Sequence, residues 1–226
     1  MADKNIHKNH RRREKEKYAK SGADAFLTHQ LLELLLYGKL LRVNTNPIAH
    51  DLLEAFPGVK LIGAAPEELE TVWGVGEKTS FSLKVSFDTT LRIICDGMEN
   101  KTLDSEFKRS TYVYLRCLGK CEESVIVWYL TEKMRVAGET EFTGKMNHPE
   151  NFAEKILSSA KNAGAKYIMI CHSHGENGTT PSVEDIYVTE YIKKYLSQTG
   201  TELLEHYIVS ETDCAKCRIP EKKDEK

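Results

Sequence analysis

Residues 171–185, CHSHGENGTTPSVED, bring together side-chain types that bind metal ions. His172 and His174 are two positions apart, so on a strand both imidazoles point to the same side. Asp185 lies where the next helix is expected to begin and can fold back beside the strand end. Two imidazoles and one carboxylate are a suitable ligand set for Zn²⁺, with a fourth position free for water. These three residues are therefore candidate zinc ligands.

Each residue of this stretch also has an ordinary structural explanation. A His-x-His pair occurs by chance in surface loops. Ser182, preceded by Pro181, is a good helix N-cap, and Asp185 three positions later imitates a capping box. Taken singly, the residues therefore favour a strand end, a loop and a capped helix, and only the spacing of the whole set favours metal.

Alternating strands and helices surround this stretch. Strands are expected over 124–131, 134–142, 166–171 and 206–210, and helices over 149–163 and 183–198. The apolar positions of the two helices recur at helical spacing, and KYIMIC (166–171) is a continuous apolar run typical of a buried strand. The order β-β-α-β-loop-α-β predicts an α/β domain with a mixed sheet.

The chain before this domain is expected to be helical. Residues 1–20 carry eight Lys or Arg against three acids and are interpreted as a basic mobile arm. Residues 21–92 predict a small all-α domain, and 93–108 a polar linker. The α/β domain then occupies 109–212, with a strand expected over Tyr112–Leu118, and 213–226 form a charged tail.

A Gly-Val-Gly turn between two short helices resembles a helix-hairpin-helix unit. Gly74, Gly76 and Lys78 are the candidate nucleic-acid contacts, because such a turn presents backbone N–H groups to a phosphate. Glycines are also the easiest way to make a tight turn. From 58 to 92 there are four basic and five acidic residues, which is less basic than most phosphate-binding surfaces. A protein-docking or structural role is therefore the stronger interpretation.

The composition places the protein among ordinary soluble proteins. At 226 residues with a net charge of −2, nothing global argues for nucleic acid. No apolar run reaches the roughly 20 residues that span a bilayer, and residues 1–20 lack the core of a signal peptide. We expect a cytoplasmic protein whose six cysteines are reduced thiols.

The spacing H-x-H, seven residues, S-x-x-D resembles the signature of the JAMM metalloproteases, whose fold is the MPN domain. His172, His174, Ser182 and Asp185 match it without insertion. With REK near the start, PEEL…VWGVGEK and E-x-x-F-x-G ahead of the histidines, residues 11–210 resemble the bacterial RadC-like proteins. The family's HNHPSG reads HSHGEN here and its HPRE reads HPEN, so the loop proline and one arginine are absent.

This resemblance implies a mixed sheet flanked by helices, as in cytidine deaminases, and a zinc-dependent hydrolase. Its substrate would be a peptide or isopeptide bond. Glu139 is implied as general base, with Glu141 as the alternative, and Ser182 as a donor to the developing oxyanion. His172, His174 and Asp185 are implied as the zinc ligands.

Two other functions remain open from the sequence. One is a catalytically idle, DNA-repair-associated module that binds DNA through the N-terminal region, or binds protein. The other is a zinc nucleobase deaminase, since His174-Gly-Glu is an H-x-E and Cys214 and Cys217 form a C-x-x-C. These cysteines could alternatively join Cys117 and Cys121 in a structural zinc site, or be inert or redox-sensitive surface thiols.

Overall fold

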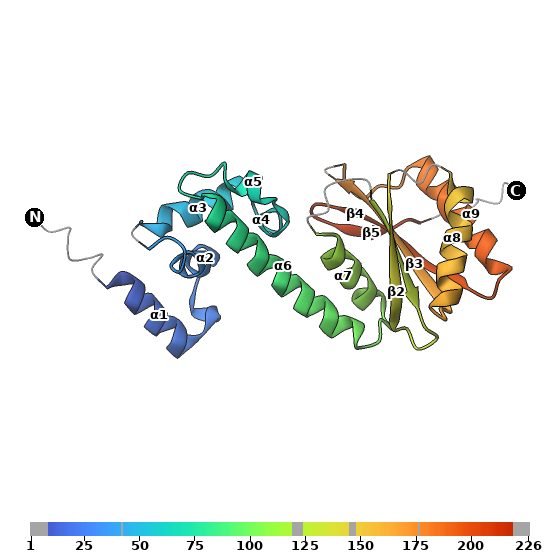
Figure 1. Ribbon diagram of the computed structural model, residues 1–226, viewed down its shortest axis with the longest axis horizontal. Helices are drawn as coiled ribbons and strands as arrows, with labels where there is room; N and C mark the ends of the chain where they lie inside the picture. Colours follow the sequence, from blue (N-terminus) through green and yellow to red (C-terminus); the bar gives the residue numbers. More distant parts are fainter. Residues whose placement is uncertain (1–8, 42, 119–123, 145–147, 176, 219–226) are drawn as a thin grey trace, which may run out of the picture. The chain divides into compact units, whose positions relative to one another are not determined.

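The computed structural model describes residues 9–41, 43–118, 124–144, 148–175 and 177–218. The chain divides into two compact units, Met1–Asp88 and Thr89–Lys226, which we describe separately (Figure 1). Among the described residues, no helix combines the length and the apolar character needed to cross a lipid bilayer.

The first unit is built from helices, as the sequence predicts. Its elements are α1 (His10–Ser21), the 3-10 helix η1 (Ala23–Ala25), α2 (Thr28–Leu36), α3 (Thr45–Ala55), α4 (Lys60–Gly63), α5 (Pro66–Leu69) and the start of α6 (Glu77–Glu99). Aliphatic side chains at helical spacing, such as Ile48 and Leu52 on α3, are fully buried and form its core.

Within the mobile arm expected over 1–20, residues 10–20 belong to helix α1, and residues 1–8 lie outside the described residues. The Arg11 guanidinium donates hydrogen bonds of 2.5–3.4 Å to the backbone carbonyls of Tyr37, Leu40, Leu41 and Val43. These carbonyls follow the C-terminal end of α2, where unpaired acceptors and the helix dipole favour a cation. Arg11 therefore caps α2, and its hydrogen bonds connect α1 to the end of α2.

The second unit is an α/β domain around a five-stranded sheet. Its strands are β1 (Ser124–Leu130), β2 (Val136–Thr143), β3 (Tyr167–Gly175), β4 (Glu202–Ser210) and β5 (Cys214–Lys216). They lie in the order β2-β1-β3-β4-β5, with β3 and β4 parallel and the other neighbours antiparallel. This is the mixed sheet that the sequence predicts.

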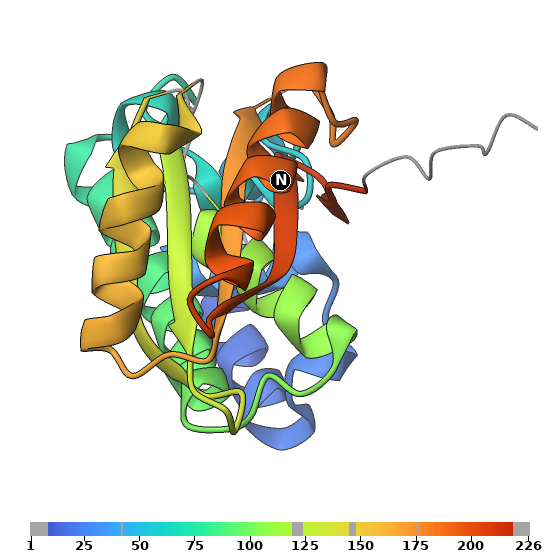
Figure 2. The same cartoon turned by 90° about the vertical axis from the view of Figure 1, so that its right-hand side faces the viewer.

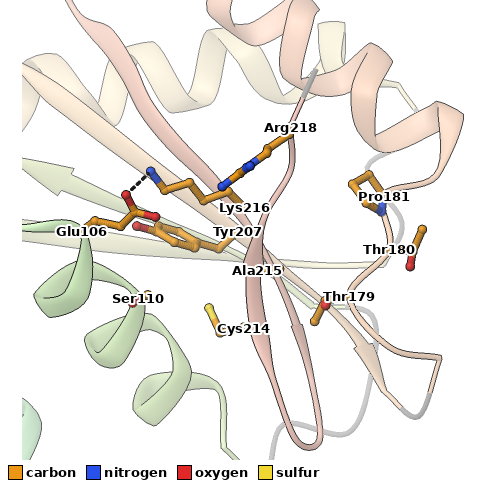
Figure 3. A pocket seen from close by; sticks show the side chains of 10 residues that line it. All are labelled: Glu106, Ser110, Thr179, Thr180, Pro181, Tyr207, Cys214, Ala215, Lys216 and Arg218. Carbon is orange, nitrogen blue, oxygen red and sulfur yellow. Dashed lines mark ion pairs between the residues drawn. The ribbon is translucent and has the colours of Figure 1, made fainter. Parts of the chain in front are cut away.

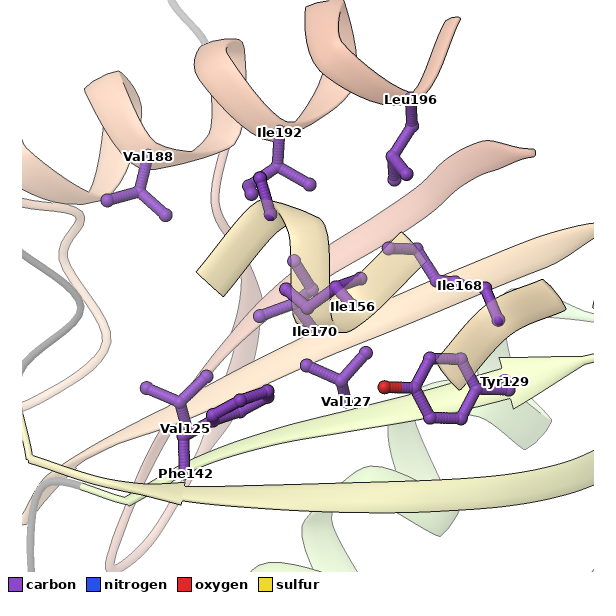
Figure 4. Close-up of a cluster of buried hydrophobic side chains, with 12 residues drawn as sticks. Val125, Val127, Tyr129, Phe142, Ile156, Ile168, Ile170, Val188, Ile192 and Leu196 are labelled. Carbon is purple, nitrogen blue, oxygen red and sulfur yellow. The ribbon is translucent and has the colours of Figure 1, made fainter. Parts of the chain in front are cut away.

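Helices cover both faces of this sheet. Helices α8 (Pro149–Asn162) and α9 (Val183–Ser197) lie side by side on one face, and α7 (Glu106–Cys117) packs on the other (Figures 1 and 2). Alternation along β1 sorts its side chains: Val127 faces α8 and α9, whereas Trp128 faces α7. The side chains that α8 and α9 bury against the sheet are shown in Figure 4. We call these two surfaces the α8/α9 face and the α7 face.

Three further segments differ from the sequence prediction. Residues 112–117, expected as a strand, belong to helix α7, which begins where Ser105 Oγ accepts a hydrogen bond from the Lys108 backbone N–H. Tyr112 and Val113 favour a strand locally, but both are fully buried on the helix face that packs on the sheet. Helix α6 runs on to Glu99, so the expected linker shrinks to 100–105. The charged tail contributes strand β5.

Candidate metal centre

Strand β3 delivers two imidazoles to one point. Ile168 and Ile170 are fully buried on the α8/α9 face, and because side chains alternate with period two, His172 and His174 follow them on that face. The strand approaches the surface there, and the two imidazoles are 15% and 19% exposed. Their Nε2 atoms lie 2.8 Å apart.

The first turn of α9 supplies a carboxylate to the same point. Ser182 is the N-cap: its Oγ accepts a 3.1 Å hydrogen bond from the Asp185 backbone N–H, and the Asp185 carboxylate accepts a 2.7 Å bond from the Ser182 N–H. The capping box orients Asp185 toward the strand end. Its Oδ1 lies 2.9 Å from His172 Nε2, and its Oδ2 lies 3.2 Å from His174 Nε2.

The three side chains form a donor set suited to zinc. Among the described residues they make up a group whose donor atoms all lie within 4.8 Å of one another. Zinc held at about 2.0–2.2 Å from such atoms keeps them roughly 3.3 Å apart, close to the separations here. Burial opposes ionisation of Asp185, but the close contact with the His172 imidazole and the hydrogen bond from the Ser182 N–H outweigh it and hold the pKa of Asp185 well below its usual range. Asp185 is therefore a ready anionic ligand.

A second layer of polar groups lies behind the cluster. His206 on β4 is buried, and its Nε2 lies 2.8 Å from His172 Nδ1. Its Nδ1 lies 2.6 Å from Thr189 Oγ1 on α9, and that hydroxyl donates a 2.6 Å hydrogen bond to the Asp185 backbone carbonyl. Burial, aided by repulsion from His172, lowers the pKa of His206 to about 3, so His206 is neutral at neutral pH.

The sequence did not point to His206 and Thr189. The available signal was one histidine inside the apolar strand HYIVS, where a polar side chain requires a partner. That partner lies 34 positions away along the chain, so spacing could not identify it.

The structure does not bring Glu139 to this cluster. Glu139 lies on β2 opposite Trp128, and its carboxylate accepts hydrogen bonds from Trp128 Nε1 and from the Arg116 guanidinium on α7. It therefore faces α7, on the side of the sheet opposite to His172. Glu141, two positions along β2, shares that face, and the intervening Thr140 faces α8 and α9. In this structure neither glutamate lies beside His172, and the general-base role of Glu139 or Glu141 stays a prediction.

Comparison with known proteins identifies the family. The family model described as "RadC-like JAB domain" matches residues 104–218. The chain belongs to this family. It is 32% identical over 211 residues to the UPF0758 protein FN0909 of Fusobacterium nucleatum, covering 89% of this chain and 91% of the relative. A UPF0758 protein of Carboxydothermus hydrogenoformans is 32% identical over 203 residues, covering 88% and 89%, and UPF0758 protein SPO0054 of Ruegeria pomeroyi is 27% identical over 208 residues, covering 91% and 93%.

The cysteines of this RadC-like domain do not form the sites considered for them. Cys214 packs into the apolar cluster on the α7 face, whereas Cys217 Sγ lies 3.3 Å from Thr189 Oγ1 on the α8/α9 face. The two thiols of the C-x-x-C thus lie on opposite sides of the sheet, which fits neither a deaminase ligand set nor a structural zinc site. Both are at least half-buried, so they are not the expected surface thiols. Cys121 lies outside the described residues.

The glycine turn of the first unit has a structural explanation at one of its two glycines. Gly74 has a φ of +87°, and a Cβ there would lie 2.7 Å from Ile48 Cδ1 on α3. Gly76 has open space around it, and its carbonyl accepts the first hydrogen bonds of α6, while Lys78 is exposed on the first turn of that helix. The nucleic-acid role of these residues stays a prediction.

A cavity of about 570 Å³ lies next to β5 in this domain (Figure 3). Its lining includes Tyr207 and Cys214, which belong to the α7-side cluster, and the ion-paired Glu106 and Lys216. In the segment that leads into α9, only residues 179–181, just before Ser182, line the cavity. His172, His174 and Asp185 do not line it.

Proposed function

We propose that this RadC-like protein is a zinc-dependent hydrolase of the JAMM type that cleaves a peptide or isopeptide bond. The observation that carries the proposal is the convergence of His172 Nε2, His174 Nε2 and the Asp185 carboxylate from two elements onto one partly exposed point. Zinc bound there would lower the pKa of a coordinated water and polarise a substrate carbonyl.

The protein groups around the ligands have separate tasks in this proposal. His172, His174 and Asp185 hold the metal. Ser182 Oγ accepts the Asp185 N–H, so its own hydrogen remains available for donation to an oxyanion of the substrate. The same serine thus orients a ligand and offers a donor, as the resemblance to the JAMM family implies.

The position of Glu139 favours a second candidate function, a metal-binding domain without hydrolytic activity. A general base must come within hydrogen-bond reach of the proton that it takes, directly or through one water. Glu139 and Glu141 both lie across the sheet from His172. Such a domain would act by binding a protein, or by binding DNA through the N-terminal region. A peptide or DNA partner is therefore proposed together with this function.

A peptidase and isopeptidase screen on three proteins, each incubated with zinc, separates the two functions. The wild type is compared with Asp185→Asn and with Ser182→Ala, and metal content is measured on the same samples. Hydrolysis by the wild type that Asp185→Asn abolishes supports the hydrolase. Full zinc occupancy in a wild type that cleaves no substrate would instead favour the inactive metal-binding module.

In the same screen, Glu139→Gln tests whether Glu139 acts as the general base. If Glu139 stays on the α7 face during turnover, the variant retains the wild-type rate. A loss of several orders of magnitude with unchanged zinc content would show that β2 rearranges to present Glu139 to the substrate.

A further inference from the structure

We infer that Thr189 and His206 are positioning residues that select the metal-binding tautomer of His172. The inference rests on the proposed metal site and concerns how this chain prepares it. A neutral imidazole has one N–H, and a histidine can bind a metal only through the nitrogen that carries no hydrogen. Something in the protein must therefore place the hydrogen of His172 on Nδ1, so that Nε2 is free.

The hydroxyl of Thr189 determines the direction of the hydrogen-bond chain. Its single hydrogen is donated to the Asp185 backbone carbonyl at 2.6 Å, and a carbonyl can only accept. Thr189 Oγ1 can then offer only a lone pair to His206 Nδ1, also at 2.6 Å. His206 must therefore carry its hydrogen on Nδ1.

Nε2 of His206 determines in turn which ring nitrogen of His172 carries the hydrogen. With its hydrogen on Nδ1, His206 presents a lone pair at Nε2, which lies 2.8 Å from His172 Nδ1. His172 Nδ1 must then be the donor, and the hydrogen bond leaves Nε2 directed at His174 and Asp185. In the reverse order, with Thr189 donating to His206, the chain would place an N–H on the ligand nitrogen and oppose metal binding.

Thr189 and His206 are buried, which strengthens the preference of the hydrogen-bond chain Thr189–His206–His172 for one tautomer of His172. His206 is 4% exposed and Thr189 is 6% exposed, so water does not compete for these bonds. The carbonyl that orients Thr189 belongs to Asp185, another ligand of the set. One side chain thus connects the backbone at Asp185 to the ring of His172, and the two ligands are aligned together.

The first test measures where the hydrogens lie and requires no variant. Long-range ¹H–¹⁵N correlation spectra of histidine-labelled, metal-free protein at pH 8 distinguish protonated from unprotonated ring nitrogens. We expect His206 to carry its hydrogen on Nδ1 and His172 to be protonated at Nδ1. A hydrogen on Nε2 of His206 would overturn the inference, and this result does not depend on zinc or on any activity.

The second test measures zinc affinity by competition with a chromophoric chelator. Thr189→Val removes the lone pair while keeping the shape, and we expect affinity to fall about 10- to 100-fold. Thr189→Ser restores the hydroxyl and should restore affinity. Thr199→Val is the matched control, because its hydroxyl only donates to the Leu196 carbonyl. Wild-type affinity in a folded Thr189→Val protein would overturn the inference.

Failure of the positioning role can be distinguished from failure of the proposed hydrolase function. A wild type that cleaves no peptide, yet shows the expected tautomers and affinity changes, removes the hydrolase and leaves the positioning role in place. Conversely, active enzyme with the reverse tautomer of His206 removes the positioning role alone.

Discussion

Arg116 and Glu139 form an ion pair on the α7 face, across the sheet from His172, His174 and Asp185. The carboxylate also accepts a hydrogen bond from Trp128 Nε1 at 3.0 Å, so the pair closes a polar network over a buried aromatic side chain. In the described structure, Glu139 thus has a structural role on the α7 face, and the catalytic role implied by family resemblance stays a prediction.

Glu139→Gln should leave zinc content unchanged and lower the free energy of unfolding by about 1 kcal/mol. The reason is that Arg116, only 16% exposed, loses its anionic partner while Trp128 keeps an acceptor. Urea unfolding and elemental analysis measure the two effects. The matched control is Glu132→Gln, at an exposed position in the turn after β1. Loss of zinc in Glu139→Gln alone would contradict this assignment.

Removal of the metal ligands should abolish stoichiometric zinc binding. The double variant His172→Ala/His174→Ala eliminates two of three donors, and elemental analysis of the purified protein should find little zinc. His148→Ala is the control, because that histidine is 73% exposed and pairs with Glu150 outside the cluster. Equal zinc content in the double variant and the wild type would refute the site.

The Cys214 thiol should react slowly despite its position beside a cavity. Burial, with smaller contributions from Cys117 and Asp213, raises the pKa of Cys214 to about 12. Because the thiolate is the reactive form, only about one molecule in 10,000 is reactive at pH 8, and the rate should rise tenfold per pH unit while the fold persists. Iodoacetamide labelling followed by peptide mass spectrometry measures this rate. Labelling in the native state as fast as in denaturant would show that the thiol is not buried as described.

Gly74→Ala should destabilise the first unit by about 1–3 kcal/mol, because the added Cβ meets Ile48 and the backbone is left-handed there. Gly76→Ala is the matched control, with open space around the new methyl group. Hydrogen exchange of the α3 amides in the full chain reports the local loss. Equal exchange in the two variants would mean that the turn relaxes around alanine.

The sequence predicted the convergence of His172, His174 and Asp185 because each step of that inference is local. Alternation along a strand places His172 and His174 together, and a capping box fixes Asp185 relative to Ser182. The family follows from the spacing of this stretch and the mixed sheet from the order of elements around it; the match over 104–218 and the observed strand order confirm them.

The face occupied by Glu139 could not be obtained in this way. Alternation along β2 shows that Glu139 and Glu141 share a face, but which face depends on the bulge near Tyr129 and on where α7 packs. Helix α7 was itself predicted in part as a strand, because Tyr112 and Val113 favour that state locally. The partnership of His172 with His206 joins β3 to β4, and no local pattern records it.

The capping box of α9 links the start of a helix to the assembly of a ligand set. The Asp185 carboxylate that holds the Ser182 N–H also lies beside the two imidazoles, so fraying of the first turn would withdraw a ligand. Helix initiation is the costly step of helix formation. A metal ion that requires Asp185 in place would therefore stabilise the first turn of α9. The helical order at residue 183 would then depend on metal occupancy.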